Sequence, residues 1–168
     1  LQSAFGYQGQ KCSACSRVIV LAGCYERFLE RLTEAVRGIR VGPPEDPACF
    51  MGPLIEPRAR ERGERYIALA EQEGRIAVRG GAPTGECYVA PVVVTDLPSS
   101  SAVLREEIFG PILAVIKAKD MAEALAIAND SDYALTGGLY SRSPSNIQQA
   151  AREFAVGNLY INRGITGA

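Results

Sequence analysis

The stretch PILAVIKAKDMAEALAIANDS, residues 111–131, decides the fold class because a buried strand and a helix follow one another in it. Residues 111–118 are apolar at almost every position, which is typical of a strand buried on both faces of a sheet. Asp120 then stands where a helix N-cap is expected, and residues 120–131 read as a helix. A buried strand that leads into a helix is the repeating unit of a parallel sheet covered by helices.

The same alternation extends outward in both directions. Further strands are predicted at residues 17–21, 75–81, 92–95, 137–141 and 158–162. Further helices, amphipathic or with clear start signals, are predicted at residues 24–39, 57–72 and 143–156. The pattern therefore predicts one α/β domain over residues 1–168, with a mostly parallel sheet covered by helices.

Composition excludes several classes of partner and chemistry. The net charge of −1 offers no basic surface, so we expect no nucleic-acid partner. The apolar runs are far shorter than the about 20 residues of a membrane helix, so we expect no membrane segment. The chain contains no histidine, which removes Cys–His and Ser–His nucleophile pairs and histidine-ligated zinc.

The chain ends and the cysteines bear on the setting of the protein. The sequence opens on Leu1 and stops within GITGA, so we expect it to be a piece of a longer protein. It contains five cysteines, an odd number, and no secretory signal. Both facts favour reduced thiols and a cytoplasmic location, or the mitochondrial matrix in a eukaryote.

The stretch GQKCSACSR, residues 9–17, holds Cys12 and Cys15 at a Cys-x-x-Cys spacing. A thioredoxin-type redox pair would follow a strand, whereas here the predicted strand comes after the motif. A zinc site needs four ligands, and the other cysteines are too irregularly spaced to complete one, so no metal is expected. One cysteine can instead be a nucleophile on an exposed turn, with backbone N–H groups aimed at a developing oxyanion. From the spacing alone, the alternative of two inert core cysteines stays open.

A second stretch with chemical potential is LREEIFGPIL, residues 104–113, in which Glu106 and Glu107 precede Phe109 and a Gly-Pro turn. Adjacent carboxylates point in different directions, so we do not expect them to act as a pair. One of them could bind a ligand hydroxyl while Phe109 offers an aromatic face. The alternative is a pair of solvent-facing acids before a strand.

Four stretches, taken in order, resemble the aldehyde dehydrogenase superfamily, and the resemblance covers essentially the whole chain. They are FGYQGQKC (residues 5–12), MGPLI (51–55), EEIFGP (106–111) and GNLYIN (157–162). The first fits the active-site cysteine signature Phe-x-x-x-Gly-Gln-x-Cys of that family. Within it, GQKCSACSR and NLYINRGITGA are most similar to the enzymes that act on 1-pyrroline-5-carboxylate, that is, glutamate γ-semialdehyde.

The resemblance implies a role for each of four residues. Cys12 would be the nucleophile that attacks the aldehyde, and Ser13 would hydrogen-bond the substrate's α-carboxylate. Glu107 would bind the ribose hydroxyls of NAD, and Phe109 would contact its nicotinamide. Cys15 lies outside the signature and is expected to be structural. The implied partner is thus an aldehyde that carries a carboxylate.

The resemblance also implies what this sequence lacks. It corresponds to the cysteine-bearing catalytic domain, whereas the NAD-binding domain, the general-base Glu and the oxyanion Asn of the family lie upstream. We therefore expect NAD to be held mainly outside this chain, the isolated chain to be inactive, and the parent to be a homo-oligomer. The alternatives are a fragment without activity or a dehydrogenase for a different aldehyde.

Overall fold

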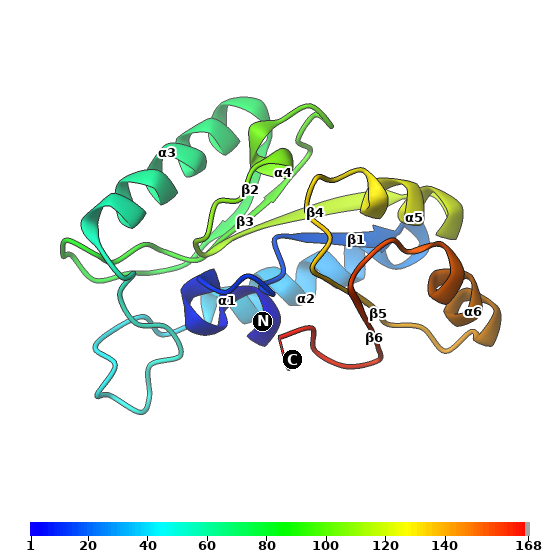
Figure 1. Cartoon of the computed structure of the whole chain (residues 1–168). Helices are drawn as coiled ribbons and strands as arrows, with labels where there is room; N and C mark the ends of the chain where they lie inside the picture. The colour runs from blue at the N-terminus through cyan, green and yellow to red at the C-terminus, as the bar shows by residue number, and fades with distance from the viewer. Residues whose placement is uncertain (167–168) are drawn as a thin grey trace.

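The computed structural model describes residues 1–166 and contains six strands and six α-helices (Figure 1). The strands are β1 (Arg17–Leu21), β2 (Arg75–Arg79), β3 (Val92–Thr95), β4 (Ile112–Ala118), β5 (Thr136–Leu139) and β6 (Asn158–Ile161). The helices are α1 (Gln2–Phe5), α2 (Tyr25–Arg37), α3 (Pro57–Glu73), α4 (Ala102–Arg105), α5 (Met121–Asn129) and α6 (Pro144–Glu153). Two short 3₁₀ segments, η1 (Gly6–Gly9) and η2 (Ala22–Cys24), complete the assignment. The last two residues of the GITGA stretch lie outside the described residues.

The strands form two sheets rather than one. The larger sheet has the order β1-β4-β3-β2, in which β4 pairs in parallel with both β1 and β3 and only the edge strand β2 is antiparallel. The smaller sheet pairs β5 with β6 in parallel, and α6 makes the crossover that such a pair requires. The predicted mostly parallel α/β class is confirmed. The division into two sheets was not predicted, because apolar periodicity does not say which strands pair.

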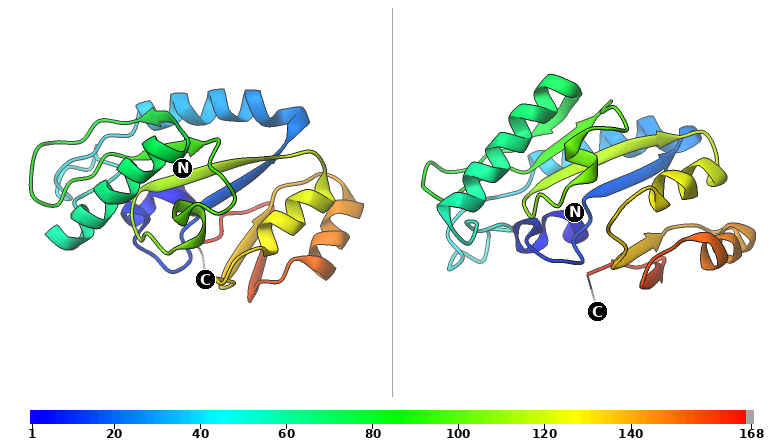
Figure 2. Two further views of the ribbon diagram at one scale, coloured as in Figure 1. Left: turned by 90° about the horizontal axis from the view of Figure 1, so that it is seen from above. Right: turned by 45° about the horizontal axis from the view of Figure 1, so that its top comes forward.

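The two central strands are buried on both faces, and alternate residues enter different cores. Val93, Leu113 and Val115 pack on the α2 side, together with Leu29 and Val36 of that helix. The alternate residues of β3 and β4 pack on the α3 side and form the second core with apolar residues of that helix. This core includes Val92, Val94, Ile112 and Ala114 of the strands and Ile67 and Ala70 of α3. Figure 2 shows α2 and α3 on opposite sides of these strands. This double covering is why residues 111–118 read as a nearly continuous apolar run.

The longer helices agree with the sequence predictions, including their start signals. Asp120 Oδ1 accepts a hydrogen bond from the N–H of Glu123 at 2.9 Å, and Ser143 Oγ accepts from the N–H of Asn146 at 3.4 Å. The short helices α1 and α4 and the two 3₁₀ segments were not predicted, because so few residues carry no periodic signal. No helix in residues 1–166 combines the length and apolarity required to cross a membrane.

Candidate active site

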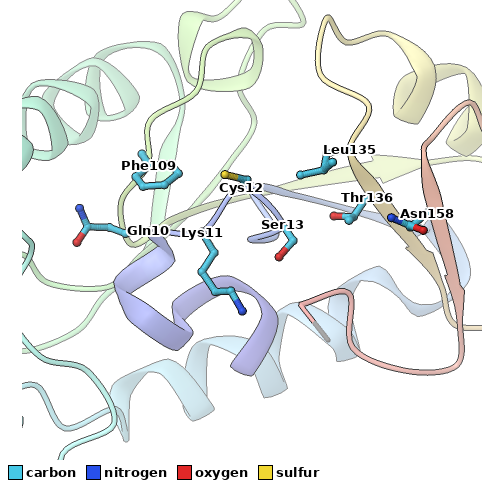
Figure 3. Close-up of a pocket in the computed structure, with 8 residues that line it drawn as sticks. All are labelled: Gln10, Lys11, Cys12, Ser13, Phe109, Leu135, Thr136 and Asn158. Atoms are coloured by element: carbon cyan, nitrogen blue, oxygen red, sulfur yellow. The ribbon is translucent and has the colours of Figure 1, made fainter. Parts of the chain in front are cut away.

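An open cavity of about 380 Å³ collects side chains from four separate parts of the chain (Figure 3). The residues that line it are Gln10, Lys11, Cys12, Ser13, Phe109, Leu135, Thr136 and Asn158. Three of the four residues expected at the site, Cys12, Ser13 and Phe109, are therefore brought together. Glu107 does not line the cavity; it is exposed on the same segment, two positions before Phe109.

The cavity lies at the amino ends of parallel strands. Cys12 and Ser13 precede β1, Phe109 precedes β4, Thr136 opens β5 and Asn158 opens β6. Because β1 and β4 pair in parallel, the segments that lead into them emerge at the same edge of the sheet. In most open α/β sheets the ligand lies beyond the carboxyl ends of the strands instead. The fold class alone would therefore not have predicted a ligand site at the amino ends.

A tight turn presents Cys12 and Ser13 to the cavity. The N–H of Ala14 donates to the carbonyl of Lys11 at 2.9 Å, which leaves Cys12 and Ser13 at the apex of the turn. The N–H of Cys15 donates to the carbonyl of Ser3 at 2.7 Å and ties the end of the turn to α1. Cys12 is exposed, and its N–H has no hydrogen-bond acceptor within residues 1–166. That N–H is thus available to an oxyanion formed beside the thiol.

Cys15 differs from Cys12 in its surroundings. Its side chain packs against the α2-side core, and its Sγ donates to the carbonyl of Arg17 at 3.3 Å. Burial raises the pKa of Cys15 to about 11, so its reactive thiolate form is scarce at neutral pH. All five cysteines are free thiols. Of the two cysteines in the motif, only Cys12 has the exposure that a nucleophile needs.

The adjacent acids of EEIFGP have separate environments. The carboxylate of Glu106 accepts a hydrogen bond from the Tyr66 hydroxyl of α3. Both residues are exposed, but the carboxylate of Glu107 makes no side-chain hydrogen bond within residues 1–166. Phe109 has a φ of +57°, a left-handed backbone that is uncommon for a residue with a Cβ. Strained backbone of this kind is often found at functional sites.

The stretches that carry the family resemblance meet around this cavity. Gly9, with a φ of +69°, lies so close to Gly110 that a Cβ on Gly9 would be 2.4 Å from the Gly110 carbonyl oxygen. Gln10 Oε1 accepts from the N–H of Ile55 at 3.1 Å, which joins the MGPLI stretch to the loop of residues 9–15, called here the Cys12 loop. Asn158, from GNLYIN, lines the cavity itself. The tertiary structure thus joins four segments that the sequence keeps far apart.

Several lining residues were missed by the sequence analysis. Lys11 reaches from the Cys12 loop to the end of the described chain, where its Nζ donates to the Thr166 carbonyl at 3.1 Å. Thr136 and Asn158 are the first residues of β5 and β6. In the sequence, Thr136 stands just before a predicted strand, whereas Asn158 opens another one and lies within the GNLYIN stretch. Leu135 supplies an apolar wall opposite Phe109 in Figure 3, with Cys12 between them.

The arrangement fits the nicotinamide end of a dinucleotide. A planar ring against Phe109 would lie in the same cavity as the Cys12 thiol, and the unengaged Glu107 carboxylate can accept hydrogen bonds from sugar hydroxyls. Within residues 1–166, no group of three or more Cys, Asp or Glu side chains is placed to hold a metal ion.

Comparisons with known proteins agree with the resemblance. The sequence model that describes the aldehyde dehydrogenase family matches residues 1–168 of this chain. The 1-pyrroline-5-carboxylate dehydrogenase of Geobacillus sp. (strain WCH70) is 45% identical over 167 residues, which are 99% of this chain and 32% of that protein. The chain thus spans about a third of the length of the curated relatives it matches.

Solved structures of similar proteins share the fold closely. The crystal structure of 1-pyrroline-5-carboxylate dehydrogenase from Thermus with bound NAD has a TM-score of 0.94 at 46% identity and covers 99% of this chain and 32% of that one. Proline utilization A from Bdellovibrio bacteriovorus has a TM-score of 0.97 at 48% identity, with 99% of this chain and 17% of that one covered.

Proposed function

Because this chain belongs to the aldehyde dehydrogenase family, we propose that it is the cysteine-bearing catalytic part of a longer NAD-dependent enzyme of proline catabolism. The substrate would be glutamate γ-semialdehyde, the open form of 1-pyrroline-5-carboxylate, and the product glutamate. The observation that carries the proposal is the exposed Cys12 thiol in one cavity with Ser13 and Phe109, while Cys15 is turned into the core. Relatives named for this activity support the choice of substrate.

In the proposed reaction Cys12 Sγ attacks the aldehyde carbon and forms a thiohemiacetal. The N–H of Cys12 donates to the oxyanion, which lowers the barrier to this step. Bound NAD supplies the acceptor for the hydride that leaves the carbon as it is oxidised. The substrate then remains on Cys12 as a thioester until water releases the carboxylic acid. The base that activates this water would come from a part of the enzyme outside this chain.

Ser13 would select substrates that carry a carboxylate. It occupies the turn position directly after the nucleophile and lines the same cavity. A hydroxyl that donates to a carboxylate makes a stronger hydrogen bond than one between neutral groups. Ser13 would therefore favour glutamate γ-semialdehyde over an aliphatic aldehyde of similar size.

The cofactor contacts proposed for this chain are few. Phe109 would face the nicotinamide and Glu107 the ribose hydroxyls, whereas the dinucleotide-binding domain would lie in the remaining part of the enzyme. The chain's share of its relatives' length supports this division. We further propose that the enzyme is a cytoplasmic homo-oligomer, in keeping with its free thiols and with the large exposed apolar side chains, such as Ile55 and Tyr140.

The test is NADH formation from glutamate γ-semialdehyde by the full-length enzyme that carries this segment. Cys12→Ser should abolish NADH formation, and Cys15→Ser should leave most of it, because only the first thiol reaches the cavity. Equal loss in two correctly folded variants would refute the assignment of the nucleophile. The isolated chain should form no NADH above its own Cys12→Ser control. NADH formation that depends on Cys12 in the isolated chain would refute the proposal that NAD is bound mainly by the rest of the enzyme.

A further inference from the structure

Helix α3 contacts the segment that contains Glu107 and Phe109 through two side chains on one face. Arg62 and Tyr66 are four residues apart, so they lie one above the other on the helix surface. Arg62 Nε donates to the carbonyl of Ile108 at 2.8 Å, and the Tyr66 hydroxyl donates to the Glu106 carboxylate. The two donors therefore bind two alternate residues of the segment.

Alternation along this segment sorts its side chains into two groups. Glu106 has an extended backbone, with φ −103° and ψ 154°, so the side chains of Glu106 and Glu107 point to different sides. Glu106 faces α3, and the side chain of Ile108 is buried in the α3-side core. Glu107 is exposed and Phe109 lines the cavity. The contacts of Glu106 and Ile108 with α3 thus fix the sides to which the side chains of Glu107 and Phe109 point.

The contacts to α3 also hold an unfavourable backbone. Phe109 adopts φ +57°, and such a conformation persists only where the surrounding structure enforces it. On one side the segment is held by Arg62 and Tyr66, and on the other Gly110 is pressed against Gly9. A tyrosine hydroxyl is a donor at neutral pH, and burial, followed by the hydrogen bond to Glu106, raises the pKa of Tyr66 further.

We propose that Arg62, Tyr66 and Glu106 are positioning residues for the cofactor: they hold Glu107 and Phe109 in the orientation that binds the nicotinamide end of NAD. The inference rests on the proposed function, because it concerns the same cofactor. The two adjacent acids, Glu106 and Glu107, have different roles in this proposal. Glu106 is bound by the protein itself, and Glu107 is left for the ligand.

The experiment measures NAD binding to the full-length enzyme in the absence of aldehyde, by isothermal titration calorimetry. Tyr66→Phe removes one hydroxyl and keeps the buried ring, and it should raise the Kd for NAD about ten-fold, the effect of losing one hydrogen bond to a charged group. Arg62→Ala, at a partly exposed position, should shift the Kd in the same direction. Glu106→Gln keeps a neutral oxygen acceptor for Tyr66 and should weaken NAD binding less than Glu106→Ala, which should resemble Tyr66→Phe.

Three further readouts separate positioning from general damage. Tyr25→Phe removes the hydroxyl of a tyrosine buried in the other core and should leave the Kd unchanged. The KM for NAD should rise in Tyr66→Phe while kcat at saturating NAD is kept, and hydrogen exchange over residues 106–110 should become faster. An unchanged Kd in Tyr66→Phe and Arg62→Ala would overturn the inference. So would a fall in kcat with no change in the KM for NAD, or a Glu106→Gln variant as weak as Glu106→Ala.

Failure of the proposed function would look different. The parent would then bind NAD without oxidising glutamate γ-semialdehyde, and the ten-fold difference in Kd between the parent and Tyr66→Phe would remain.

Discussion

Replacing Gly9 with alanine tests how firmly the Cys12 loop is held against the turn that contains Phe109 and Gly110. Gly9 has a φ of +69°, and an alanine Cβ there would lie 2.4 Å from the carbonyl oxygen of Gly110 and 2.8 Å from its carbonyl carbon. Both are backbone atoms, so no side-chain rotation can relieve the overlap. The Ala4 carbonyl oxygen, 3.1 Å from the same Cβ, closes another side. Relief therefore requires the two loops to separate.

Two costs add in this variant. A left-handed backbone costs a residue with a Cβ about 1–2 kcal/mol, and overfilling a closely packed site costs about 1–3 kcal/mol. We therefore expect Gly9→Ala to lower the free energy of unfolding by about 2–5 kcal/mol. For a chain of this size, such a loss corresponds to a fall in Tm of roughly 4–20 °C.

Urea unfolding followed by circular dichroism measures this change. Gly81→Ala is the matched control, since no atom lies within 4 Å of its added Cβ and its φ is outside the left-handed region. The control should change the free energy of unfolding by less than about 1 kcal/mol. If Gly9→Ala were no less stable than Gly81→Ala, the two loops would not be locked together as described.

Two other predictions concern the specificity of the site and the stability of the fold. In the full-length enzyme, Ser13→Ala should lower kcat/KM for glutamate γ-semialdehyde by about ten-fold or more, because one charge-assisted hydrogen bond is lost. The kcat/KM for an aliphatic aldehyde should fall much less. Equal losses for the two substrates would show that Ser13 does not bind the carboxylate. The hydrogen bond from Arg105 to Asp130 lowers the pKa of Asp130 in the folded state, so its contribution to stability is present above the unfolded pKa of about 3.9 and is lost as pH falls through the folded value. The wild type should therefore be more stable than Asp130→Asn at pH 7, and urea midpoints measured toward acid pH should converge; a gap that stayed constant with pH would contradict this account.

The sequence resemblance was sufficient to propose Cys12 as the nucleophile, but it did not show how the surroundings of neighbouring site residues differ. Cys12 and Cys15 are three positions apart and chemically identical in the sequence. They differ because the turn from Lys11 to Ala14 exposes the first, while the core beside α2 covers the second. Glu106 and Glu107 are likewise equivalent until Tyr66, forty residues upstream, binds one of them.

Local pattern was sufficient for the elements of the fold. Helices such as α2 and α3 and strands such as β4 follow from apolar spacing and from caps such as Asp120, all of which depend on residues near one another in the chain. The sequence by itself thus determined the α/β class, the order of the strands and longer helices, and the stretch that carries the proposed nucleophile.

The tertiary structure decided which of these elements meet. Pairing of β1 with β4 brings the Cys12 loop and the Phe109 turn to the same end of the sheet, and contact between Gly9 and Gly110 sets their separation. The assignment of β5 and β6 to a second sheet, and the left-handed backbone of Phe109, follow from packing between distant segments. Such contacts depend on the whole fold at once, because no residue near Phe109 in the chain requires a positive φ; α3 and Gly9 hold it there.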